Sequence, residues 1–363
     1  MTPSLKDQEP STPPTISAGA VSTPDAAPPR LPFSIAALVF LRDRGIVVLW
    51  LLLLVFFSII ARPYFASLAN GLLILSAASL TAVFAAGVAI SALSGALDLS
   101  VAGVAAFAGV VTARLITLDV PVWLALVVGL LIGLLAGLMN GLVTLRGLNP
   151  LVVTIGTLSV LSGLAAVVSG GYTISGLNKL TFMGTARYFG IPAHVFIVAV
   201  LYFIGWIFLT RTRHGIRLVA VGGNPEAVRR VGINSARYQL LGFVLCGACS
   251  ALGGLMTAAL VTEASPEASP GSIFQALTAV ALSGVSLGGG RGSLPKVLLG
   301  AIILATISDG LTIAGVEPYW ATVSTGVLMI GALIIDRVLT RSISDRLVAV
   351  GGLSTHTKHS KKP

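Results

Sequence analysis

Few side chains in this sequence have the type and spacing that catalysis or metal binding requires. Cys246 and Cys249 form a Cys-x-x-Cys pair, a spacing that supports redox chemistry or zinc binding in other settings. Here the pair lies inside an apolar stretch without a histidine or a charge beside it, so we interpret the two thiols as small buried side chains. We interpret the four histidines as residues of loops and tails and not as metal ligands. The sequence therefore predicts neither a metal site nor a catalytic centre.

A glycine-rich run, Gly288–Ser293, has a superficial likeness to a phosphate-binding loop. It lacks the lysine of the Gly-x-x-x-x-Gly-Lys-Ser/Thr pattern, and it follows an apolar helix, whereas a phosphate loop follows a strand. We interpret Gly290, Arg291 and Gly292 as a tight turn. The chain is thus expected to have no nucleotide site of its own.

The remaining candidates are single polar side chains inside long apolar stretches. A polar group at membrane depth is costly unless it faces a cavity or another helix, so we interpret these residues as candidates for lining a solute path. They are Asn140, Thr154, Thr157, Ser159, Gln275, Thr278, Ser308 and Asp309.

Two carboxylates among the polar residues require separate interpretation. A carboxylate near the centre of a spanning helix costs about 2.5–3.5 kcal/mol on insertion scales. For Asp309 two interpretations stay open: contact with a solute, or a structural role, either nearer the interface or paired with a backbone donor of another helix. Asp98, followed by Ser100, is interpreted as a cap for the helix that begins near residue 100, and Asn149 with Pro150 as the start of another helix.

The elements that must hold these residues are apolar. Of the 363 residues, 55% are hydrophobic and 10% are charged, whereas a soluble domain carries about a quarter charged residues. The 41 glycines fit lipid-embedded helices, in which small residues let backbones approach closely. The composition excludes an ordinary soluble enzyme and predicts an all-α integral membrane protein.

Ten apolar stretches approach the length of about 20 residues that a spanning helix needs. In the fourth of them Gly129, Gly133, Gly137 and Gly141 recur every four residues and predict a face for close helix packing. We therefore predict about ten transmembrane helices, near residues 45–61, 70–92, 100–117, 121–145, 150–170, 193–210, 239–261, 273–288, 296–315 and 319–336.

Basic residues predict the orientation of these spans, because lysine and arginine are retained on the cytoplasmic side. With ten spans and an internal N-terminus, only Arg62, Arg114, Lys179 and Arg187 of the 23 basic residues fall outside. Both termini are therefore predicted to be cytoplasmic. The net charge of +10 arises from short loops, which favours contact with lipid headgroups and argues against nucleic-acid binding.

Composition divides the chain into three regions. Residues 1–40 are rich in proline, serine and threonine and are predicted to form a disordered cytoplasmic tail. Residues 41–337 hold the spans, with a long cytoplasmic loop at 211–238, and residues 338–363 form a basic cytoplasmic tail.

The loop at 211–238 carries clear signals for a short helix. Asn224 is a favoured N-cap residue, Pro225 suits the first helical position, and Glu226 complements the positive end of the helix. Gly232 suits a left-handed terminator. So short a helix is marginal in water by itself, so its capping predicts docking against a partner protein. A helix that rests on the lipid surface is the alternative.

Several motifs in this order resemble those of permease subunits of ribose-type ABC sugar importers, within the branched-chain amino acid/ribose permease family. The resemblance extends over roughly residues 70–336. The matching segments are Leu93–Val101, Gly137–Gly141 with Asn149–Ser159, Gly222–Ala227 with Gly232-Ile233, and Ser283–Ser293.

The resemblance implies a type II ABC importer-like permease bundle in a bacterial inner membrane. It implies three kinds of partner: a second permease copy, two ATPase subunits that bind ATP and Mg²⁺, and an extracytoplasmic binding protein. The implied solute is a monosaccharide such as ribose or xylose. The implied coupling helix consists of Asn224, Pro225, Glu226, Ala227, Arg229, Arg230, Gly232 and Ile233.

Other interpretations stay open beside this one. Within the ABC class, a permease for nucleosides or branched-chain amino acids is the main alternative, and a secondary transporter is a weaker one. Where the family often has acidic residues, this chain has Phe274–Thr278, which favours a different solute or a distinct second permease. The outer loop Glu263–Gly271, with two glutamates and two prolines, is a candidate docking edge for the binding protein.

Overall fold

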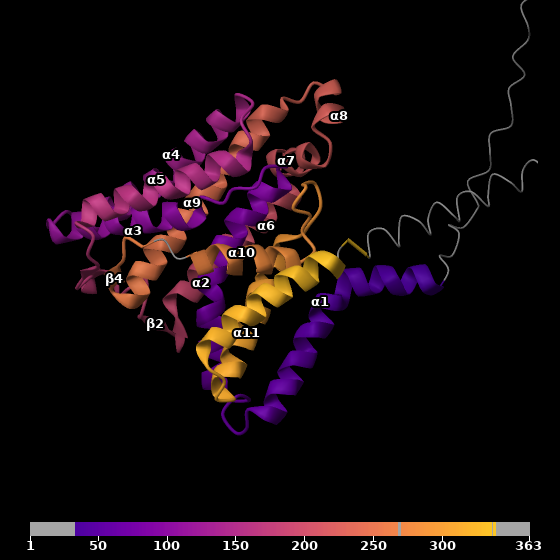
Figure 1. Cartoon of the computed structure of the whole chain (residues 1–363), viewed down its shortest axis with the longest axis horizontal. Helices are drawn as coiled ribbons and strands as arrows, with labels where there is room; N and C mark the ends of the chain where they lie inside the picture. Colours follow the sequence, from indigo (N-terminus) through magenta and orange to yellow (C-terminus); the bar gives the residue numbers. More distant parts are fainter. Residues whose placement is uncertain (1–32, 268–269, 336, 339–363) are drawn as a thin grey trace, which may run out of the picture.

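The computed structural model describes residues 33–267, 270–335 and 337–338, and this part of the chain is almost entirely helical (Figure 1). Its long helices are α1 (Phe33–Ile60), α2 (Leu68–Leu93), α3 (Val101–Thr117), α4 (Val122–Leu145), α5 (Pro150–Ser169), α6 (Ala193–Arg211), α9 (Ser235–Val261), α10 (Pro270–Leu282), α11 (Leu294–Ile313) and a last helix over Pro318–Ile335.

The shorter elements lie between the long helices. Two helices, α7 (Arg213–Gly223) and α8 (Pro225–Arg230), connect α6 to α9, and one 3₁₀ turn covers Asn178–Leu180. Strand β1 (Ile174–Ser175) pairs antiparallel with β4 (Glu263–Ala264), and β2 (Arg187–Tyr188) with β3 (Ile191–Pro192).

The predicted spans are confirmed. Seven of the described helices are long and apolar enough to cross a bilayer, and three shorter apolar helices, Arg44–Ile60, Val101–Thr117 and Gly271–Leu282, bring the total to ten. Helix α1 begins at Phe33, earlier than the predicted tail of residues 1–40 allows, because the apolar run Phe33–Leu41 continues the helix toward the N-terminus. Residues 1–32 and the predicted tail after Val338 lie outside the described residues.

Helices α2 and α9 form the centre of the bundle. Within its apolar window α2 is 67% buried and α9 61%, whereas α5 is only 11% buried. Helix α9 packs against α2, α3 and α4, and α1 packs on α11 through Phe57. The helices of the periphery, α5 above all, offer their side chains to lipid or to another chain.

The glycine ridge of α4 packs backbone against backbone on α9. A Cβ on Gly133 would collide with the carbonyl oxygen of Gly247, and a Cβ on Gly137 would collide with that of Phe243. Close approach of this kind replaces the hydrophobic driving force that lipid removes. The predicted packing role of the ridge is therefore confirmed at these positions.

Seven of the exposed aromatic side chains lie in loops or first turns at the helix ends opposite α7 and α8. Membrane proteins place aromatic belts at both membrane–water interfaces, and this level is one of the two. They are Tyr64, Trp123, Tyr172, Tyr188, Phe189, Tyr319 and Trp320. The belt marks a membrane interface, and the orientation rests on the basic residues, which predict α7 and α8 on the cytoplasmic side.

The α4–α9 contact leads to a prediction about stability. Gly137→Ala should lower the melting temperature of the purified protein, because overpacking costs about 1–3 kcal/mol. Gly163→Ala in α5 is the matched control: its Cβ meets nothing within 4 Å, and glycine inside a helix costs roughly 0.5–1 kcal/mol relative to alanine. Thermal unfolding in detergent measures both variants, and equal shifts would contradict the packing role.

Candidate functional site

Helices α7 and α8 project from one end of the bundle (Figure 1). The Asn224 side chain accepts a hydrogen bond from Ala227 N at 2.9 Å, Pro225 occupies the first turn, and Gly232 is left-handed with φ +80°. The predicted helix and both of its end signals are thus confirmed. Because Val228 is buried, α8 is held to the bundle by one apolar side chain.

Most side chains of α8 are exposed. Arg229 and Arg230 are exposed, and Val231 is 73% exposed. Helix α7 is held more firmly, because Arg217 Nη1 donates to the hydroxyl of buried Tyr238 in α9 at 3.3 Å. The pair therefore presents a cationic helix on a fixed support.

The end of α7 lies against two turns that are distant in sequence. A Cβ on Gly222 would collide with the carbonyl oxygen of Leu93 and stand 2.8 Å from the nitrogen of Gly290. That nitrogen donates to the oxygen of Leu93 at 3.2 Å. We name this contact the glycine junction; it comprises Leu93–Gly95, Gly222-Gly223 and Gly289-Gly290.

The glycine junction depends on backbone conformations that favour glycine. Gly95, Gly289 and Gly290 have φ of +87°, +100° and +72°, a region that costs a residue with a Cβ. The predicted turn at Gly290–Gly292 is confirmed, since Ser286 N donates to the oxygen of Arg291 at 2.9 Å across it. The junction therefore joins the α2–α3 turn, the end of α7 and the α10–α11 turn at the base of α8.

A buried hydrogen-bond network begins at Asp98, five residues beyond Leu93 in the same turn. Oδ1 of Asp98 accepts from the nitrogen and the hydroxyl of Ser100 at 2.8 and 2.6 Å. Nδ2 of Asn140 in α4 donates to Ser100 Oγ at 2.9 Å, and the Thr157 hydroxyl of α5 donates to Asn140 Oδ1 at 2.6 Å. The network therefore fixes the α2–α3 turn to both α4 and α5.

The carboxylate of this network is well supplied with donors. Asp98 lies outside the spanning helices and is only 1% exposed. This burial raises the pKa of its carboxyl group above the ordinary 3.8. Hydrogen bonds from Ser100, Asn140 and the Cys246 thiol lower the pKa and so oppose the effect of burial. A buried polar group is stable only when it is paired. The contact with Cys246 gives α9 a place in the network that the sequence did not indicate.

The other predicted polar residues lie apart from this network. Buried Thr154 donates to the oxygen of Pro150 at 2.9 Å and Thr278 to that of Phe274 at 2.6 Å, both within their own helices. Gln275 is exposed, and its Oε1 accepts from Thr81 at 3.4 Å.

Asp309 and Asn149 each accept a hydrogen bond near the end of a helix. Asp309 accepts from Nδ2 of Asn70 at 2.8 Å, and both residues lie near the ends of their helices opposite α8. Asp309 is thus paired with another helix, but its donor is a side-chain amide and not the backbone donor that the sequence suggested. Asn149 caps α5 by accepting from Leu151 N at 2.9 Å, with Pro150 in the first turn.

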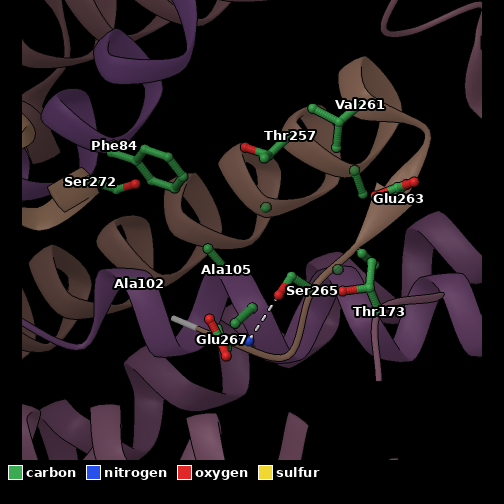
Figure 2. A pocket seen from close by; sticks show the side chains of 15 residues that line it. Phe84, Ala102, Ala105, Thr173, Thr257, Val261, Glu263, Ser265, Glu267 and Ser272 are labelled. Carbon is green, nitrogen blue, oxygen red and sulfur yellow. Dashed lines mark hydrogen bonds between the residues drawn. The ribbon is translucent and has the colours of Figure 1, made fainter. Parts of the chain in front are cut away.

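A cavity of about 280 Å³ lies between α2, α3 and α9 (Figure 2). Phe84 closes one side, and small residues of α3 and α9 form the walls. Figure 2 shows the Thr257 oxygen turned toward the side on which Phe84 lies, while the Ser265 oxygen faces the backbone nitrogen of Glu267. Sequence reasoning missed this site, because Phe84 and its neighbours have no pattern that separates them from core residues.

The residues that line the cavity come from both ends of the bundle. Thr173 and Glu263 line it beside the β1–β4 pair, at the end opposite α8. Ala102 lines the cavity at the end nearer the α2–α3 turn, because it lies in the first turn of α3, two residues after Ser100. The α2–α3 turn therefore lies between the cavity and the glycine junction.

The ten apolar helices of the described chain define the protein as a polytopic membrane protein. The family model described as "Branched-chain amino acid transport system / permease component" matches residues 70–333. The chain belongs to this family. No solved structure matches it.

Three curated relatives cover most of this chain and of their own length. The L-arabinose transport system permease protein of Escherichia coli (strain K12) is 34% identical over 88% of this chain and 97% of its own. The ribose import permease protein of Bacillus subtilis (strain 168) is 34% identical over 80% and 91%. The D-allose transport system permease protein of E. coli (strain K12) is 31% identical over 86% and 96%.

The buried network leads to a paired prediction. Thr157→Val should lower the melting temperature, because Asn140 Oδ1 loses its donor and an unpaired buried acceptor costs about 1–3 kcal/mol. Thr154→Val removes only a bond within its own helix and should be close to neutral. Thermal unfolding of both variants measures the difference, and a larger loss for Thr154→Val would contradict the network's role.

Proposed function

We propose that this chain is the membrane-spanning permease subunit of an ATP-driven importer for a monosaccharide, in a bacterial inner membrane. The observation that carries the proposal is α8, a capped cationic helix whose outer side is exposed. A helix of six residues gains stability from docking, and a cytoplasmic ATPase subunit is the partner that this family of permeases leads us to expect.

The proposal assigns ATP chemistry to other chains. The sequence has no Gly-x-x-x-x-Gly-Lys-Ser/Thr loop, so ATP and Mg²⁺ are bound by two separate ATPase subunits. A second permease copy completes the solute path, and an extracytoplasmic binding protein delivers the solute to the end opposite α8. There the Glu263–Ala264 strand offers an edge beside the cavity mouth.

The glycine junction supplies a route for the ATP-driven motion. Movement of α8 reaches α7 directly, and α7 ends in contact with Leu93 and Gly290. Displacement of Leu93 would carry the α2–α3 turn, and with it the start of α3. Closely packed backbones have few ways to deform gradually and therefore transmit such a displacement.

Solute class follows from the relatives and from the charge of the cavity. The relatives named above are permeases for arabinose, ribose and allose, all of them neutral polyhydroxylated sugars. Among the described residues that line the cavity none is lysine or arginine, while Glu263 and Glu267 are acidic. A neutral polyol fits this lining better than an amino acid, whose carboxylate needs a cationic partner.

Uptake by the complete transporter tests the function. The permease, reconstituted in liposomes with its ATPase and binding protein, should accumulate at least one of L-arabinose, D-ribose and D-allose when ATP is present. Leucine and uridine represent the alternative solute classes. Accumulation of only leucine or uridine, or of a sugar without ATP, would contradict the proposal.

Two neighbouring glycines test the transmission route. Gly222→Ala should reduce ATP-driven uptake about tenfold or more, because the overlap with Leu93 costs about 1–3 kcal/mol. Gly223→Ala is the control, since its Cβ meets nothing nearer than Gly290 Cα at 3.7 Å. Size-exclusion profiles establish that both variants fold. Equal uptake by the two folded variants would rule out the junction as a route.

A further inference from the structure

We infer that the cavity between α2, α3 and α9 is a monosaccharide-binding subsite in which Phe84 packs against the sugar ring while Thr257 and Glu267 pair with its hydroxyl groups. This inference rests on the proposed function and specifies where within one protomer the solute is held.

The size of the cavity limits its occupant. Its volume of about 280 Å³ is just below the range of roughly 300–1,000 Å³ that holds drug-sized ligands. A single sugar ring is smaller than such a ligand, whereas a nucleoside carries a base in addition to its sugar. A monosaccharide therefore fits within this volume.

Small residues create this volume. Ala102, Ala105, Ala106 and Gly109 line it from α3, and Gly254 faces them from α9. The two helices are in close contact at that level, since a Cβ on Gly254 would collide with the oxygen of Ala105. The space is therefore bounded by backbone, and its shape is set by packing.

The lining supplies both kinds of contact that a sugar ring requires. A pyranose or furanose ring has C–H groups on its faces and hydroxyl groups around its rim. Phe84, only 6% exposed, is the one aromatic side chain among the described residues of the lining, and an aromatic ring attracts C–H groups to its negative face. Thr257 donates to the oxygen of Gly253 at 2.8 Å, so its own oxygen remains an acceptor for a sugar hydroxyl.

Glu267 completes the polar side of the cavity. Its backbone nitrogen donates to Ser265 Oγ at 3.2 Å, which holds the segment, and Figure 2 shows its carboxylate turned toward Ala105. A carboxylate accepts hydrogen bonds from two adjacent hydroxyl groups. The absence of lysine and arginine from the described lining leaves this carboxylate available to a neutral polyol.

The test compares transport and selectivity in the reconstituted transporter. Thr257→Val and Glu267→Gln should each reduce sugar uptake at a saturating concentration of loaded binding protein about fivefold to tenfold. Each should also reduce the preference for the parent sugar over at least one deoxy analogue, because a deoxy sugar lacks the hydroxyl that the variant cannot pair. Phe84→Leu should reduce uptake of all the sugars, and ATP hydrolysis without solute should stay within twofold of the wild type.

Thr312→Val is the matched control. Thr312 donates to the oxygen of Ser308 four residues earlier at 2.8 Å, as Thr257 does to that of Gly253, but it lies on α11 outside the cavity. The control should keep wild-type uptake and selectivity. Wild-type uptake and selectivity in all three cavity variants would overturn the inference.

The two proposals fail in different ways. If the wild-type transporter takes up no monosaccharide, the proposed function is wrong. If it does so while the cavity variants, monodisperse and thermally stable, discriminate deoxy sugars as the wild type does, only the subsite is wrong. Phe84→Tyr, which keeps the ring, is a second variant at that position and should retain more uptake than Phe84→Leu.

Discussion

The backbone contact between Gly222 and Leu93 positions the parts of the molecule that the proposed function uses. On one side of it, Gly222-Gly223 leads directly into Asn224, the N-cap of α8. On the other side, the α2–α3 turn carries Asp98 and Ser100, and α3 begins immediately afterwards. A side chain at Gly222 would separate the two. The docking helix, the buried network and the wall of the cavity therefore depend on one contact that has no room for a Cβ atom.

The buried network gives this contact a rigid continuation. Asp98 is paired with Ser100, Ser100 with Asn140, and Asn140 with Thr157, so the turn is fixed to α4 and α5 through directional bonds. Lipid provides no hydrophobic force between helices, and directional bonds together with close glycine packing supply the cohesion instead. Small residues then have two uses: on α4 they let the backbone approach α9, and on α3 they line the cavity.

Local signals were readable from the sequence, whereas contacts between distant residues were not. Asn224, Pro225 and Gly232 act within one short helix, so their identities alone predicted its start and end, and the four-residue spacing of Gly133 and Gly137 predicted a packing face. The Asp98–Asn140 network joins residues 42 positions apart, and Asn70 meets Asp309 across 239, separations for which one sequence contains no signal. Phe84 was missed for another reason, since an aromatic residue among apolar ones has the same pattern in a core as in a cavity wall.

Hydrogen exchange of the assembled transporter, with and without ATP, tests the central claim that the glycine junction links α8 to the α2–α3 turn. We expect ATP to change exchange at residues 93–100 and 284–293 together with the change at residues 213–232. A change confined to residues 213–232, with 93–100 unaltered, would contradict the account.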